Sequence, residues 1–85
     1  MLFTDAKRID RDVCIAMMDA WEEDSTSIPQ EKFWFYKDEC YICIDNTDGY
    51  FSIEAFGNPE AAHVWLRGMN IVKAMELDNF INNNI

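Results

Sequence analysis

Strand-forming residues are concentrated in the middle of the chain, where aromatic and β-branched side chains alternate with other residues in three short segments. The three segments are Lys32–Tyr36, Cys40–Ile44 and Tyr50–Phe56. Short alternating segments of this composition, separated by turn residues, are typical of β-strands. We therefore predict that the chain is organised around a three-stranded antiparallel β-meander.

The connections between these segments are short enough for neighbouring strands to be antiparallel. Lys37-Asp38-Glu39 suits a tight hairpin, and Asn46-Thr47-Asp48-Gly49 ends in a glycine that can adopt the positive φ of a hairpin loop. Side chains alternate across a strand, so one face of the sheet collects the aliphatic positions of the second and third segments. We predict that this face is the core and that the opposite face is a mixed aromatic and acidic surface.

Helical patterns flank the predicted meander on both sides. Thr4 is a suitable N-cap for an amphipathic helix that continues to about Glu23. After the meander, Asn58 and Pro59 are typical of a helix start, and Gly68 interrupts the apolar stripe that follows. The predicted fold is a single α+β domain over residues 1–85, in which an N-terminal helix precedes the meander. A C-terminal helix or two short helices follow, and the helices form one layer on one face of the sheet.

Length and composition limit the class of protein. The chain has 85 residues, 49% of them hydrophobic, which is too many for a disordered segment, and its apolar runs are far shorter than a membrane span. Three cysteines are an odd number and suit reduced thiols better than a disulfide framework. No secretory signal opens the sequence. We therefore expect a cytoplasmic protein without a membrane segment, in a host cytoplasm if the gene belongs to a phage.

The predicted order of elements is similar to that of the double-stranded RNA-binding domain. Those domains contact phosphates through lysines at the start of the final helix, whereas the corresponding segment here is Glu60-Ala61-Ala62-His63. The likeness is one of topology, and topology does not determine function. We expect no direct binding of nucleic acid, because the one basic cluster, Lys7, Arg8 and Arg11, lies among acids.

Candidate catalytic and metal-binding residues are few. Cys40 and Cys43 form a C-x-x-C pair, and with Cys14 and His63 they give the number of ligands of a zinc site. Residues three apart on a strand point to opposite faces, so we predict ordinary thiols and no metal. His63 is the only histidine, and no glycine-rich phosphate loop or nucleophile motif is present. We predict neither an enzyme nor a bound cofactor.

Charge is the most distinctive property of the sequence. Sixteen acids oppose seven bases, giving a net charge of −9, and no Lys or Arg lies among the six acids between Asp12 and Glu31. On a helix, Asp12 and Asp19 would be about 10 Å apart and Asp19 and Glu23 about 6 Å apart along the axis. This spacing is comparable to that of phosphates along a nucleic-acid backbone. The alternative is a solvated acidic face that serves only solubility.

From these observations we predict a non-enzymatic binding protein that imitates nucleic acid and inhibits a basic nucleic-acid-binding protein. A nuclease, restriction enzyme or CRISPR effector would be such a partner, as for the anti-restriction and anti-CRISPR proteins of phages. The alternative is an adaptor or homodimerising module that uses the aromatic face of the sheet. The predicted partner-binding residues are Asp12, Asp19, Glu22, Glu23, Asp24, Asp38, Glu39, Asp45, Asp48, Glu54, Trp34, Tyr36, Tyr41 and Tyr50.

Overall fold

The computed structural model describes residues 2–84 and has an α+β fold. Its elements are, in chain order, β1 (Lys7–Arg8), α1 (Arg11–Glu23), β2 (Lys32–Lys37), β3 (Cys40–Asp45), β4 (Ser52–Phe56), α2 (Pro59–Leu66) and α3 (Ile71–Asn83). The strands form one sheet in the order β1-β2-β3-β4, in which β1 is parallel to β2 and the other pairs are antiparallel. The predicted α+β class and central meander are confirmed, and of the two predicted C-terminal arrangements the structure has two helices.

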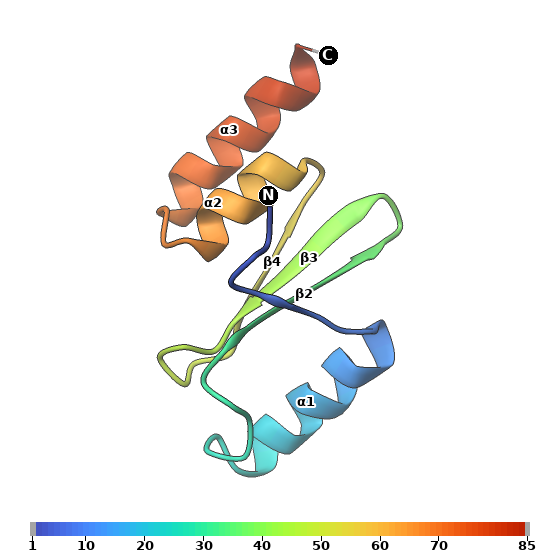
Figure 1. The fold of residues 1–85 in the computed structure, drawn as a ribbon, viewed down its shortest axis with the longest axis vertical. Coiled ribbons are helices and arrows are strands. Elements are labelled where there is room, and N and C mark those ends of the chain that lie inside the picture. The colour runs from blue at the N-terminus through green and yellow to red at the C-terminus, as the bar shows by residue number, and fades with distance from the viewer. Residues whose placement is uncertain (1, 85) are drawn as a thin grey trace.

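Helices cover both faces of the sheet (Figure 1). Phe33 and Phe35 of β2 are buried in a core that includes Cys14 of α1, whereas Cys43 and Phe56 are buried in a second core with residues of α2 and α3. In Figure 1 the sheet runs diagonally, with α1 at its lower right and α2 and α3 at its upper left. The predicted single layer of helices on one face is therefore wrong.

The composition of β2 explains this two-sided arrangement. Phe33, Trp34 and Phe35 are consecutive aromatic residues, and consecutive side chains of a strand point to opposite faces. Each face of the sheet therefore carries apolar surface that needs cover, which is the pattern of a strand buried on both sides. Cys43 and Ile44 of β3 repeat the pattern, since both are fully buried and lie in different cores.

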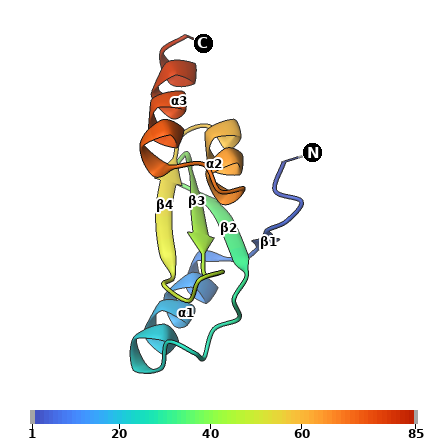
Figure 2. The same ribbon diagram turned by 90° about the vertical axis from the view of Figure 1, so that its left-hand side faces the viewer.

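The N-terminal segment departs from the prediction. Thr4 does not cap a helix; α1 begins at Arg11, after Asp10 at the N-cap position. Lys7 and Arg8 instead pair with β2, and the Ile9 N–H donates to the Trp34 carbonyl at 2.9 Å. The outer edge of β2 offers backbone groups that need partners, and satisfying them outweighs the local preference for helix. Figure 2 shows this segment beside β2, at the edge of the sheet opposite β4.

Residues 2–6 continue across the face of the sheet that α2 covers. The Phe3 ring stacks on Trp34 with 4.4 Å between centroids, and its backbone N–H donates to His63 Nδ1 at 3.2 Å. An ion pair of 3.1 Å between Asp5 and Arg67 of the α2 C-cap adds a further contact. The N-terminal segment is therefore part of the second core.

The β2–β3 loop lies where it was predicted, whereas the β3–β4 loop is longer than predicted. Asp38 and Glu39 both have positive φ, 54° and 63°, as in the two-residue turns that join tightly paired strands. Gly49 has φ of 83°, as predicted. The third strand starts at Ser52 rather than Tyr50, because Phe51 also has positive φ, 50°, and its N–H donates to the side chain of Asn46.

The start of α2 and the break between the two C-terminal helices lie where they were predicted. The Asn58 side chain accepts a hydrogen bond from the Glu60 N–H at 2.9 Å, and Pro59 is the first residue of α2. Gly68 has φ of 108° and follows the end of α2, and Asn70 caps α3 by accepting from the Val72 N–H at 2.8 Å. Within the described residues, no helix is long and apolar enough to cross a membrane.

Candidate functional site

The acids of α1 form a continuous exposed edge. Asp12, Asp19 and Glu23 are seven and four residues apart, so they lie on one side of the helix, about 10 Å and 6 Å apart along its axis. The opposite side holds the helix to the sheet through Cys14 and Trp21. All three acids are exposed. We call them the acidic edge.

The acidic edge continues into an acidic end at the C-terminus of α1. We define the acidic end as Glu22, Glu23, Asp24 and Asp48. The indole Nε1–H of Trp21 donates to the Gly49 carbonyl at 2.8 Å, which fixes the end of α1 against the loop between β3 and β4. Because that loop carries Asp48 and the helix end carries the other three acids, the structure brings four predicted site residues to one end of the molecule.

Asn46 positions the two loops at this end. It is fully buried, and its Nδ2 donates to the carbonyls of Ile28 at 3.3 Å and Pro29 at 2.9 Å. Its Oδ1 accepts from the Phe51 N–H at 3.0 Å. The loop after α1 and the loop after β3 are thereby joined. Sequence reasoning assigned no role to Asn46; the available signal was its position at the start of a loop that contains Asp and Gly.

The loop carboxylates also have structural roles. Asp24 accepts hydrogen bonds from the backbone N–H and hydroxyl of Thr26 at 3.0 and 2.7 Å, and these bonds lower the pKa of Asp24. Asp45 accepts the same two bonds from Thr47, and Asp48 accepts from the Tyr50 N–H. These carboxylates stabilise their turns while leaving a negative charge at the loop surface.

A groove lies between the two loops. It has a volume of about 610 Å³ and is lined by residues 25–26 and 28–30 of one loop and by Asp48, Gly49 and Tyr50 of the other. The side chain of Tyr50 is 75% exposed at its rim. An exposed aromatic ring beside a group of carboxylates is suited to contact a cationic surface, since both the ring face and the carboxylates attract cations.

The other predicted acids lie elsewhere. Asp38 and Glu39 form the turn between β2 and β3, at the opposite end of the strands from Asp48. Glu54 lies within β4, and Asp45 is a half-buried residue at the end of β3. Asp38, Glu39 and Glu54 therefore lie apart from the acidic end, whereas Asp45 directly precedes the loop that carries Asp48.

The predicted aromatic surface is largely covered. Trp34 and Tyr41 are half-buried and pack against Phe3, whose ring centroid lies 4.4 Å from Trp34 and 5.9 Å from Tyr41. Tyr36 is 49% exposed, but Tyr50 lies in the loop at the other end of the strands. The prediction of an exposed aromatic and acidic sheet face is wrong, because the consecutive aromatic residues of β2 provide two cores.

The cysteines and His63 are dispersed. Cys14 and Cys43 are buried in different cores, on opposite faces of the sheet. Burial raises the pKa of the Cys43 thiol to about 12 and also raises that of Cys14. The Nδ1 atom of His63 is already an acceptor for the Phe3 N–H. Over residues 2–84, no three His, Cys, Asp or Glu side chains are placed to hold a metal ion together.

The chain was compared with known protein families, curated proteins and solved structures. Neither protein-family models, nor curated proteins, nor solved structures gave a match to the chain.

Proposed function

We propose that this protein is a non-enzymatic binding protein whose acidic edge and acidic end engage the basic surface of a nucleic-acid-binding protein. A nuclease, restriction enzyme or CRISPR effector whose nucleic-acid site is blocked in this way would be inhibited. The observation that carries the proposal is the unpaired charge of the acidic edge on α1. The ion pairs found among residues 2–84 are Lys7–Glu31 and Asp5–Arg67, and neither involves the acidic edge.

Rigidity supports the same proposal. The acids of α1 project from a helix whose other side packs on the sheet through buried Cys14 and half-buried Trp21. The loops at its end are fixed by Asn46 and Trp21. A preformed array of charges binds with a smaller loss of conformational entropy than flexible acidic tails do. Nucleic-acid-binding surfaces are basic and attract such an array over a distance of about a Debye length.

Charge reversal on α1 tests the proposal. Lysine substitution of Asp19, Glu22 and Glu23 changes the net charge by 3 × 2 = 6, from −9 to −3. A matched control carries the same change at Glu54, Glu60 and Glu76, which lie on β4, α2 and α3. Each immobilised protein is used to capture partners from host lysate at about 0.05 and 0.5 M salt, where the Debye length falls from roughly 14 to 4 Å.

We expect wild type and control to capture the same basic nucleic-acid-binding protein, and the α1 variant to lose it. Competing duplex DNA and high salt should both release this partner. With the purified partner, the α1 variant should lower the association rate by about tenfold or more, because charge complementarity acts mainly on encounter. A partner retained by the α1 variant at both salt concentrations would refute the proposal.

A homodimerising or adaptor module is the alternative, and it would have to use the exposed apolar side of α3 instead of the predicted aromatic face of the sheet. Residues 2–6 and α2 cover the aromatic face of the sheet, whereas α3 exposes Val72, Met75 and Phe80 by 59%, 46% and 65%. Sedimentation of the wild-type protein distinguishes the two proposals. A monomer at micromolar concentration agrees with the acidic ligand of a separate partner, and a stable dimer weakened by Phe80→Ser would favour the alternative.

A further inference from the structure

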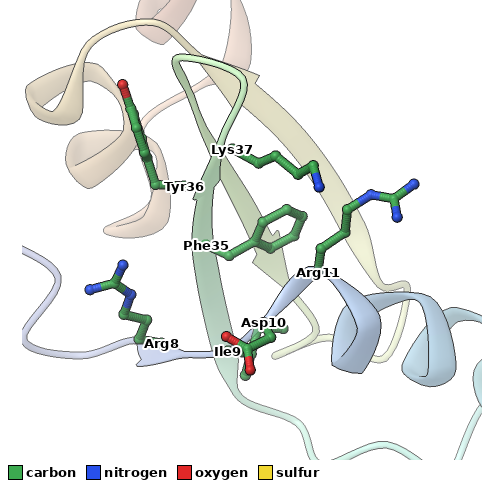
Figure 3. A pocket seen from close by; sticks show the side chains of 7 residues that line it. All are labelled: Arg8, Ile9, Asp10, Arg11, Phe35, Tyr36 and Lys37. Atoms are coloured by element: carbon green, nitrogen blue, oxygen red, sulfur yellow. The ribbon is translucent and has the colours of Figure 1, made fainter.

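Basic side chains gather near the N-terminal end of α1, away from the acidic end at its C-terminus. Arg8 of β1, Arg11 of α1 and Lys37 of β2 line a hollow of about 280 Å³, shown in Figure 3. We call these three residues the basic corner. All three are exposed, and within the described part of the chain none of them forms an ion pair. One carboxylate, Asp10, also lines the hollow, so three cations and one anion give its lining a formal charge of +2.

The hollow lies beside an open strand edge. Pairing between β1 and β2 ends at Arg8 and Trp34, and the chain then turns away into α1. The Trp34 carbonyl points toward β1, since it accepts from the Ile9 N–H. Peptide groups two residues apart on a strand point to the same side, so the N–H and carbonyl of Tyr36 face outward beyond the end of β1. Such an edge can pair with an added strand.

The cations are placed on both sides of this edge. The Arg8 guanidinium lies over the Trp34 ring at 5.1 Å, on the face that α2 covers. Figure 3 shows Arg11 and Lys37 on the other side of β2, together with Phe35. A single small anion could not contact both groups across the strand. Neighbouring side chains of an extended peptide point to opposite faces, so two consecutive acidic residues could meet both groups at once.

From this geometry we propose that the basic corner and the open edge of Tyr36 bind an extended acidic peptide segment of a partner protein. The peptide would pair with β2 through the backbone of Tyr36. One carboxylate would face Arg8 and the next would face Arg11 and Lys37. A second hollow of about 330 Å³ extends from Phe35 toward Ile42 and is also lined by Asp38. It offers room for an apolar side chain of the peptide rather than a further acid. This site shares no residue with the acidic edge or the acidic end.

A synthetic peptide tests the site directly. The probe is acetyl-Thr-Val-Glu-Asp-Thr-Val-amide, titrated at 0.15 M salt so that repulsion by distant acids of the protein is screened beyond about 8 Å. Two-dimensional NMR of the isotope-labelled protein gives the affinity and the amides that shift. We expect the Tyr36 amide to shift and to become protected from hydrogen exchange. A Gln-Asn replacement of the two acids, or methylation of the peptide backbone nitrogens, should each weaken binding about tenfold or more.

Two charge reversals on the protein separate a specific site from general attraction. Lys37→Glu changes the basic corner, and Lys73→Glu makes the same change at an exposed lysine of α3. We expect about a tenfold weakening for the first and less than twofold for the second. Equal weakening by both variants, or a Tyr36 amide that does not respond, would overturn the proposal. Tighter binding of an octathymidine oligonucleotide, itself weakened by Lys37→Glu, would assign the corner to nucleic acid and would equally overturn it.

Discussion

Replacing Asn46 by alanine should lower the free energy of unfolding by more than replacing most polar residues does. The side chain is fully buried and makes three hydrogen bonds, to the Ile28 and Pro29 carbonyls and from the Phe51 N–H. Alanine leaves the Ile28 carbonyl and the Phe51 N–H without partners in buried surroundings, at about 1 to 3 kcal/mol each. The Pro29 carbonyl keeps a partner, because it also accepts from the Glu31 N–H at 2.9 Å. We therefore expect a loss of about 2 to 6 kcal/mol.

Such a loss is large for this chain. At roughly 0.05 to 0.15 kcal/mol per residue, 85 residues give a total stability of roughly 4 to 13 kcal/mol. Urea unfolding followed by tryptophan fluorescence measures the change. The free energy of unfolding falls by about 1 kcal/mol per molar urea, so the unfolding midpoint of the variant should lie about 2 M or more below that of wild type. Asn70→Ala is the control, because it removes one exposed capping bond, worth about 1 kcal/mol. Equal losses for the two variants would show that Asn46 does not hold the loops as described.

Three further predictions concern thiols, pH and backbone conformation. In the folded protein, a maleimide at pH 7 should label the half-buried Cys40 well before Cys43, whose pKa of about 12 keeps it protonated; mass spectrometry of timed samples gives the order, and equal rates would contradict it. The lowered pKa of Asp24 stabilises the fold above the pKa of the unfolded state, about 3.9, and this contribution is lost as pH falls through the folded value. The difference in urea midpoint between wild type and Asp24→Asn should therefore shrink from pH 7 to pH 2.5, and a constant difference would refute it. Gly68→Ala meets no neighbouring atom but must adopt φ of 108°, so the thermal midpoint should fall by several degrees, for a loss of about 1 kcal/mol or more; an unchanged midpoint would show that the residue relaxes without cost.

The parts of the fold that could be predicted are those set by neighbouring residues. Turn residues defined the meander, and Asn58, Pro59 and Gly68 defined the ends of α2, because caps and turns depend on a few consecutive residues. The position of the first helix start could not be predicted in this way. Whether residues 4–10 become helix or strand depends on the open edge of β2, which is distant in the sequence.

The same distinction applies to the candidate site. The acidic edge follows from helical periodicity, so Asp12, Asp19 and Glu23 could be grouped from the sequence. The acidic end depends on contacts between α1 and a loop more than twenty residues away, which the pattern does not contain. The aromatic surface was misplaced because only one face of the sheet was expected to be buried, whereas both are. Three consecutive aromatic residues in one strand indicate two buried faces.

The docking of residues 2–9 has a consequence for the order of folding. The meander and the α2–α3 pair join residues that are close in the sequence, so little chain entropy is lost when they form. Phe3 reaches His63 across 60 residues, and β1 can pair only with a β2 that already exists. We expect this segment to dock last and to open first, so the Ile9 amide should exchange faster than those of β3. Each opening would uncover Trp34 and Tyr41, the aromatic pair that the segment otherwise shields.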